Sequence, residues 1–312
     1  MTPVTNLPNT SPITLKIDHV TIAGPDLHVM ERSFAAIGLA TDYGGPHAAL
    51  THMAILGFDD GSYIELISSQ DPVENSPQLS THHWGKFIAG NAGPCAWAVE
   101  VDDVARESAR VAALGIPVTG PLPGSRRRPD GTLAEWDTAV LGPGPPGATL
   151  PFIIKDRTPR GLRVQRSASV SGVDENGEPR RDRLTGVGAV VLGVDDLEDA
   201  AGILRLIYDW PAPIMRVDDA FAATLAYFPG TPVVLAASSK QGDWLDERLT
   251  RFGPAPCAYL IGAASLEDAA TRFHLTASVD WFGRRAMWFD AESVNDTLLG
   301  IVEQPEPTQP EP

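Results

Sequence analysis

The sequence predicts an α+β fold in which four β-α-β-β-β units pair into two domains with curved mixed sheets. A strand, a capped helix and further strands recur along the 312 residues, and internal repeats indicate architecture more firmly than local propensity does. Units one and three align without a gap, because Asp26-Leu27 recurs 170 residues later as Asp196-Leu197. Units two and four both begin with Pro-Cys-Ala, at residues 94–96 and 256–258. Each domain is therefore expected to hold two units.

The first unit shows the pattern most clearly. Residues 15–23 form an apolar strand, and Asp26 is a helix cap in front of a helical stripe of apolar residues. After a short second strand, the stretch 51–69 reads as two strands of a hairpin around the turn Asp59-Asp60-Gly61. The other units are expected to open with the strands and helix caps 94–101 with Asp103, 186–194 with Asp196, and 255–261 with Ser265.

The repeats and the composition between them divide the chain into five parts. The expected parts are a disordered tail at 1–14, a first domain at 15–156, a polar exposed linker at 157–183, a second domain at 184–302 and a disordered Pro/Glu-rich tail at 303–312.

Composition excludes several classes of protein. The net charge of −16 argues against nucleic-acid binding, where a basic face is expected. No apolar run approaches the roughly 20 residues of a membrane helix, and the N-terminus lacks a signal pattern, so we expect a cytoplasmic protein. The two cysteines, Cys95 and Cys257, occupy the same repeat position and are expected to be buried hydrophobes. The expected partner is a small molecule; the oligomeric state stays open, with a homodimer as one alternative.

Glu65 interrupts an otherwise apolar strand. Burial of an unpaired carboxylate costs several kcal/mol, so Glu65 is expected to meet a metal, a cation or a substrate proton. If the hairpin turns at residue 60 or 61, the alternation of side chains places His52 on the same face. The pattern therefore predicts Glu65 and His52 as catalytic residues.

Three motifs carry a resemblance to a known superfamily. IDHVTIAGPDL (17–27), GGPHAALTHMAILGFDDGSYIELI (44–67) and SRRRPDGTLAEW (125–136) resemble the vicinal oxygen chelate superfamily, and within it glyoxalase-like domain proteins. The resemblance implies paired units that close a curved sheet around a cavity. It also implies a divalent metal (Zn, Fe, Mn or Ni), held by a His on the first strand and a Glu or Gln on the fourth strand of each unit.

On this sequence the resemblance implies His19 and Glu65 as metal ligands. The second unit offers Ala96 and the apolar strand 152–154 instead, so half of the usual ligand set is missing. Because a catalytic metal takes about three protein ligands, a third is expected from His52, with His82 or His83 as alternatives.

The third unit lacks these polar residues. With the offset of 170, His19, His52 and Glu65 correspond to Ala189, Ala222 and Leu235. We therefore expect an apolar patch in the second domain and a site only in the first.

Arg126, Arg127 and Arg128 precede the turn Pro129-Asp130-Gly131. A guanidinium binds a carboxylate or phosphate through paired hydrogen bonds, so the three arginines are predicted to bind substrate, as is Trp84; the alternative for the arginines is a solvated charge run. Alternation places Arg127 opposite Arg126 and Arg128.

Together these observations predict a metal-dependent lyase or isomerase that acts on a small oxygenated molecule, with an anionic group as one alternative. Two other functions stay open. One is metal-free binding and sequestration of a small molecule. The other is an extradiol-type ring-cleaving dioxygenase, which requires two His and one carboxylate on iron.

Overall fold

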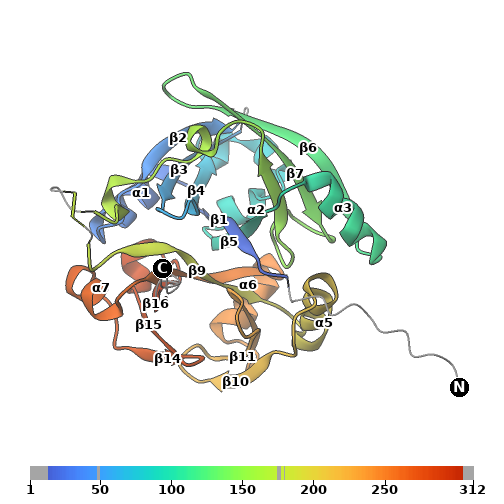
Figure 1. Ribbon diagram of the computed structural model, residues 1–312, viewed down its shortest axis with the longest axis vertical. Coiled ribbons are helices and arrows are strands. Elements are labelled where there is room, and N and C mark those ends of the chain that lie inside the picture. Colours follow the sequence, from blue (N-terminus) through green and yellow to red (C-terminus); the bar gives the residue numbers. More distant parts are fainter. Residues whose placement is uncertain (1–12, 48–49, 174–176, 179, 305–312) are drawn as a thin grey trace, which may run out of the picture.

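The computed structural model describes residues 13–47, 50–173, 177–178 and 180–304. Two curled, eight-stranded mixed sheets form two domains, which are stacked vertically in Figure 1. The strand orders are β2-β3-β4-β1-β5-β8-β7-β6 and β10-β11-β12-β9-β13-β16-β15-β14. This confirms the predicted α+β fold of four β-α-β-β-β units in tandem domains. Most of the expected disordered tails, 1–14 and 303–312, lies outside the described residues.

The strands of the first sheet are β1 (Lys16–Ala23), β2 (Asp42–His47), β3 (Thr51–Gly57), β4 (Tyr63–Ser69), β5 (Gly93–Glu100), β6 (Val118–Arg127), β7 (Leu133–Leu141) and β8 (Phe152–Asp156). Those of the second are β9 (Leu184–Gly193), β10 (Ile214–Asp218), β11 (Ala223–Tyr227), β12 (Val233–Ser238), β13 (Ala255–Ala263), β14 (Val279–Trp281), β15 (Arg284–Trp288) and β16 (Leu299–Glu303). The α-helices are α1 (Leu27–Ala36), α2 (Gly85–Ala89), α3 (Val104–Ala113), α4 (Arg160–Arg163), α5 (Leu197–Tyr208), α6 (Trp244–Phe252) and α7 (Leu266–Arg272).

A side-chain cap begins the crossover helix of every unit. The caps are Asp26, Asp103, Asp196 and Ser265, and each accepts a hydrogen bond from a backbone N–H three residues later. These are the four residues that the sequence predicts. No helix in the described part of the chain is long and apolar enough to cross a membrane.

One strand of the first sheet escaped prediction. β6 contains Pro121 and Pro123, which are typical of loops, and the peptide between Gly120 and Pro121 is cis. Proline is tolerated on an edge strand because the missing N–H then costs no ladder hydrogen bond. β6 lies at the edge of its sheet, where Pro123 pairs with Asp137 and the ladder is irregular only between Thr119 and Leu122, around Pro121.

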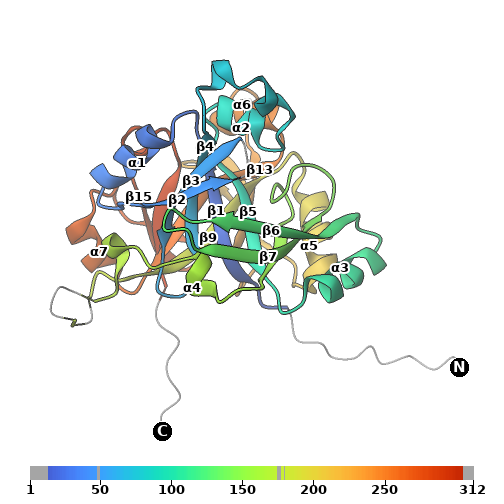
Figure 2. The same cartoon turned by 90° about the horizontal axis from the view of Figure 1, so that it is seen from above.

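The two sheets share a hydrophobic core on the faces that point away from the first-domain cavity described below. Val20 and Trp97 from the first sheet belong to one buried cluster with Val190 and Tyr259 from the second. Helices α2 and α6, which lie side by side in Figure 2, extend this contact. Their Phe87 and Phe252 rings stack with centroids 5.6 Å apart. The inner face of each sheet takes no part in this shared core.

The linker segment, residues 157–183, is not the exposed connection that its polarity predicts. It carries α4 and returns over the β3–β4 hairpin (yellow-green in Figure 1), where the Ser167 hydroxyl accepts a hydrogen bond from Gly57 N. Arg163, Ser167 and Val170 are all buried. Their burial brings part of this segment into the first domain.

Candidate functional site

A cavity of about 580 Å³ lies on the inner face of the first sheet. Residues of β1–β4 and β6–β8 line it, together with the loop before α2 and one residue of α4. Of the predicted site residues, the cavity wall includes His19, Glu65, His82, His83, Trp84 and Arg126. This volume is in the range typical of sites for small molecules.

A β-bulge in β1 brings Asp18 against His19. Ile17 pairs with Val99 and His19 with Ala98, so Asp18 is the extra residue of the bulge. A bulge redirects side chains out of strict alternation, and Asp18 Oδ1 lies 2.5 Å from His19 Nδ1. Because this bond occupies Nδ1, Nε2 is the ring nitrogen that His19 can offer to the cavity. Nε2 has no hydrogen-bond partner among the described residues.

Two arginines of the linker segment hold Asp18. Arg163 donates to both carboxylate oxygens over 3.0 and 2.7 Å, and Arg160 donates to Asp18 Oδ2 as well. Arg163 also forms paired hydrogen bonds with Asp156. Burial alone would raise the pKa of Asp18, but the charge of Arg163 and the hydrogen bond with His19 hold it well below its usual range. Asp18 therefore stays ionised and fixes the orientation of His19.

Aromatic neighbours hold the imidazole ring of His19 from two sides. The ring stacks on Tyr63 with centroids 4.5 Å apart and meets the edge of Phe152 at 5.2 Å. Arg163 donates to the Tyr63 hydroxyl over 3.0 Å, and burial raises the pKa of that hydroxyl. Tyr63 therefore stays protonated and keeps its own O–H available as a donor.

Glu65 faces the cavity one strand away from His19. It lies opposite Thr21 in the parallel ladder, and the Thr21 hydroxyl donates to Glu65 Oε2 over 3.0 Å. Oε1 lies 3.8 Å from His47 Nε2. The contacts of this buried carboxylate are thus a hydroxyl and an imidazole, and the metal, cation or substrate proton that the sequence predicts for it stays a prediction.

His47 is a cavity residue that the sequence did not single out. It ends β2 and pairs with Thr51, which shares the cavity face with Glu65. Burial lowers the pKa of His47, an effect that the nearby charge of Glu65 partly offsets and that of Arg126 reinforces. His47 is therefore neutral at pH 7. The registers of the β2–β3 and β3–β4 hairpins together would have placed His47 in the cavity. The lengths of the hairpin loops decide these registers, and the sequence left those lengths open.

The predicted shared face of His52 and Glu65 is wrong. Glu65 pairs with Ile55, and His52 pairs with Ser68 three residues further on, so their side chains leave the sheet on opposite faces. The hydrogen bond from Phe58 N to Ser62 O closes a three-residue loop, whereas the shared face requires an even number of loop residues. His52 instead lines a groove beside the N-terminus of α1. It is in no position to act as a ligand or catalytic residue in the cavity.

The three arginines divide between the cavity and the solvent. Arg126 lines the cavity and is 4% exposed. Arg127 points out and donates to Gly131 O, while Arg128 binds Gln165 at the surface. Alternation accounts for Arg127, and the end of β6 at residue 127 frees Arg128 from the cavity face. Only Arg126 remains a candidate for substrate binding.

Trp84, His82 and His83 form the wall of the cavity in front of α2. The two imidazoles stack with centroids 4.2 Å apart, and His83 meets the edge of Trp84 at 4.5 Å. Trp84 Nε1 donates to Pro146 O over 3.1 Å, which fixes the indole against the opposite loop. Burial lowers the pKa of His83 to about 4 and also lowers that of His82, so both rings are neutral at pH 7.

The side chains present do not fit the implied metal. The register places Ala96 and Phe152 where the second unit would supply its His and its Glu or Gln. No three His, Cys, Asp or Glu side chains among the described residues lie close enough together to share a metal ion. A catalytic metal or an iron dioxygenase centre needs about three protein ligands. The donor set of this cavity falls short of that number.

The second domain has no polar counterpart of the cavity site, although the predicted counterpart of Glu65 is wrong by one position. Thr21 pairs with Glu65 in the first sheet, and the same place in the second is taken by Val191 and Val234. Leu235 faces the shared core, and Ala222 lies outside β11. The second hairpin closes a four-residue loop, one residue longer than the first, and this difference shifts the register.

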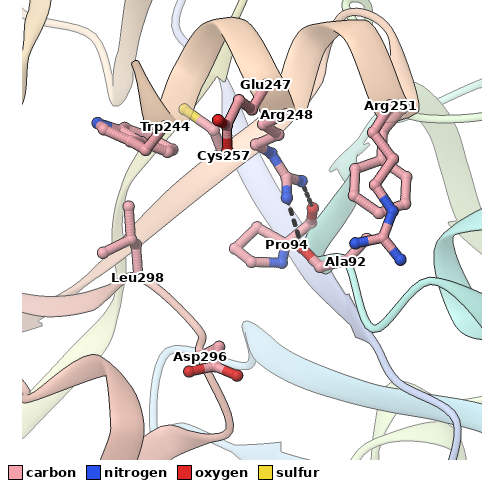
Figure 3. A pocket seen from close by; sticks show the side chains of 10 residues that line it. Ala92, Pro94, Trp244, Glu247, Arg248, Arg251, Cys257, Asp296 and Leu298 are labelled. Carbon is pink, nitrogen blue, oxygen red and sulfur yellow. Dashed lines mark hydrogen bonds between the residues drawn. The ribbon is translucent and has the colours of Figure 1, made fainter. Parts of the chain in front are cut away.

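A smaller cavity of about 260 Å³ lies between the domains, beside α6 (Figure 3). Arg248 crosses it and donates to the carbonyls of Ala92, Pro94 and Pro256, which belong to both domains. Burial raises the pKa of the Cys257 thiol to about 12, so this cysteine is unreactive at neutral pH. Both cysteines are buried and free, as predicted. Arg248 therefore links the two domains at this cavity.

Comparison with known proteins supports the same architecture. The family described as "Glyoxalase-like domain" matches residues 17–206. A hypothetical protein from Staphylococcus aureus superposes with a TM-score of 0.58 at 11% identity, over 93% of this chain and all of its own. A mutant of 4-hydroxymandelate synthase from Streptomyces coelicolor superposes with a TM-score of 0.56 at 12% identity, over 94% of this chain and 93% of its own. No sequence among the curated proteins matches.

Proposed function

Because the chain belongs to the glyoxalase-like domain family, within the vicinal oxygen chelate superfamily, we propose that its first domain is an enzyme that moves a proton on a small oxygenated molecule. His19 and Glu65 are the two groups that exchange the proton. A single observation carries this proposal: the buried hydrogen bond from His19 Nδ1 to Asp18, which leaves Nε2 to the cavity.

The arrangement gives the two groups complementary abilities. Nδ1 of His19 donates its proton in the hydrogen bond to Asp18, so Nε2 is the nitrogen that can accept a proton from a substrate. The carboxylate of Asp18 then stabilises the imidazolium that results. Glu65 offers a carboxylate oxygen on the same face. A carbon acid next to a carbonyl would lose its proton to one of these bases, and its electron pair would enter the carbonyl as an enolate. Return of a proton to carbon completes an isomerisation without any redox change.

The experiment follows exchange of carbon-bound protons. Wild-type protein is incubated in D₂O with a panel of small 2-oxo and 2-hydroxy carbonyl compounds, and ¹H NMR records loss of the signal next to the carbonyl. His19→Gln and Glu65→Gln are expected to slow exchange about 100-fold or more. His52→Gln is the matched control, because this histidine belongs to the same domain but lies on the opposite sheet face. Equal exchange rates in wild type and in both site variants would reject the proposal.

Binding without turnover is the second candidate, and it is supported by the apolar wall of the cavity. Phe152 lines the cavity in the place of a ligand, and Trp136, Val140 and Ile154 add further apolar surface. A sequestering protein would bind compounds from the same panel in calorimetry while leaving all their proton signals intact. Exchange catalysed at any one of them decides in favour of the enzyme.

A further inference from the structure

Arg126 is a buried cation without a carboxylate partner among the residues that the structure describes. Nη2 donates to the carbonyl of Arg163 over 2.6 Å, and Nη1 contacts the sulfur of Met53. Nε is buried and has no hydrogen-bond partner. A guanidinium has five N–H donors, and leaving a buried charge unpaired costs several kcal/mol. Burial accordingly lowers the pKa of Arg126.

The second guanidinium of the cavity wall shows what a satisfied arginine looks like in this protein. Arg163 forms paired hydrogen bonds with Asp18 and Asp156, and these two carboxylates neutralise its charge. Arg126 has no such pair, and it is not within ion-pair distance of Glu65. Arg126 therefore presents a positive charge to the cavity without a direct ion pair, and the charge of Glu65 acts on it only from beyond ion-pair distance.

The backbone around Arg126 is shaped to admit its guanidinium. A Cβ atom on Gly44 of β2 would lie 2.7 Å from Arg126 Nη1, and one on Gly45 would lie 3.0 Å from the carbonyl of Arg127. These two glycines let β2 approach β6 closely enough to enclose the side chain. A larger residue at position 44 would displace the guanidinium.

Much of the remaining cavity wall is aromatic or aliphatic. Trp84, Trp136 and Phe152 contribute three aromatic rings to the cavity, and Leu122 and Val140 contribute aliphatic surface. Such walls favour a planar hydrocarbon body over a sugar or a polyanion, because each polar group taken from water into them needs a new partner.

We infer that the cavity takes a monocarboxylate with a flat apolar body, and that Arg126 binds the carboxylate. This inference specifies the substrate class for the proposed function, and it rests on that function for the premise that the cavity binds a substrate. A single negative charge matches the single charge of Arg126, whereas a phosphate dianion would leave excess charge in an apolar site. Fixing the carboxylate at Arg126 directs the rest of the molecule toward Glu65 and His19. It also keeps the negative charge of the substrate apart from that of Glu65.

The test compares two probes of equal shape, phenylacetate and phenylacetamide, by titration calorimetry. Wild type is expected to bind the acid at least tenfold more tightly than the amide, which corresponds to about 1.4 kcal/mol. Arg126→Gln is expected to lower affinity for the acid about tenfold or more and to leave the amide within twofold. Arg127→Gln is the matched control, since this neighbour points out to solvent, and it should change neither. Phenyl phosphate is the third probe and is expected to bind more weakly than phenylacetate.

Three outcomes overturn the inference: equal binding of acid and amide, tighter binding of the phosphate, or an unchanged preference in Arg126→Gln. If Arg126→Gln binds neither probe, Arg126→Lys decides, because it keeps the charge. Loss of the preference for acid in a folded Arg126→Lys protein that still binds the amide contradicts the inference, as does loss of binding to both probes. The proton-transfer proposal fails separately, in the exchange rates of the His19 and Glu65 variants.

Discussion

On the inner face of the first sheet stand His19, Thr21 and Glu65, and at the same places in the second sheet stand Ala189, Val191 and Val234. The difference extends to the supporting residues. Thr21, which binds Glu65, is replaced together with it. The bulge that carries Asp18 is kept in β9, but the extra residue there is Gly188. The two copies therefore differ in the whole set of polar groups, which is expected if each group needs the others to be tolerated in a buried place.

The second inner face uses its space for packing instead. Phe221, Trp281 and Trp288 lie within 5.7–6.3 Å of one another, centroid to centroid, and Val234 belongs to the same buried cluster. A Cβ on Gly188 would lie 2.8 Å from a methyl carbon of Val302, so this bulge has no room for an aspartate. One architecture therefore supports a site in one copy and a filled core in the other. The following substitutions test that contrast.

Glu65→Val copies the second domain into the first and is expected to have the largest effect. Proton exchange should fall about 100- to 10,000-fold, because one of the two proton-transfer groups is removed. Stability should be unchanged or higher, since replacing a buried charged group by an apolar one is often neutral or stabilising. Exchange by NMR and urea unfolding measure the two effects. An exchange rate within threefold of wild type would remove Glu65 from the mechanism.

Val234→Glu is the reciprocal change and is expected to destabilise the protein by about 3 kcal/mol or more. A carboxylate at this position would be buried among aromatic rings, without the hydroxyl and imidazole that Glu65 has. Urea unfolding measures the loss, with Val234→Leu as a control that should cost less than about 1.5 kcal/mol. A fully stable Val234→Glu protein would show that the second face admits polar groups after all.

Thr21→Val removes one hydrogen bond from Glu65 and keeps the shape of the side chain. Proton exchange is expected to fall about tenfold, because a hydrogen bond to a charged group contributes about 1.5–3 kcal/mol. Thr21→Ser restores the hydroxyl and should recover most of the rate. A loss as large as that of Glu65→Val would mean that Thr21 does more than orient the carboxylate.

The smallest expected effect concerns pH. Because burial lowers the pKa of His47, the folded protein binds fewer protons than the unfolded chain as pH falls through the ordinary value near 6.5. Stability should therefore decrease between pH 7 and pH 5, and His47→Gln should flatten this decrease. The groups that act on His47 are Glu65, whose charge opposes the effect, and Arg126, His19 and His82, whose positive charges add to it. Urea unfolding at several pH values, with His28→Gln at an exposed histidine as control, would contradict this if the two variants behaved alike.

The repeat pattern predicted most of the architecture. Four strand–cap–helix segments, each with its cap, specify the units, and apolar strands specify which faces are buried. The face on which some side chains lie remained open, because it changes when a hairpin loop is one residue longer or shorter. Three residues rather than two around Asp60 moved His52 to the opposite face, and one extra residue in the second hairpin exchanged Val234 for Leu235. Side-chain alternation turns each such difference into a change of face.

Other parts of the site depended on long-range contacts that no local pattern encodes. Asp18 supports His19 because a bulge redirects it, and a bulge leaves no clear signal in an apolar strand. Arg163 comes from a segment whose polarity is typical of an exposed linker, and it is buried because Asp18 and Asp156 neutralise it. His19, Glu65 and Arg126 were nearer to prediction, since a charged or ionisable residue inside an apolar strand, or at the end of one, already suggests a specific partner.

Tyr259 gives the second domain an influence on a site to which it contributes no lining residue. Its hydroxyl lies 2.7 Å from the carbonyl of Ala96 and 3.0 Å from that of Thr21, behind the two strands at the centre of the first sheet. A substitution at Tyr259 would move the backbone that carries the partner of Glu65, so the second domain constrains the geometry of the proposed site. Laboratory evolution of the first domain can accordingly expect useful substitutions in the second.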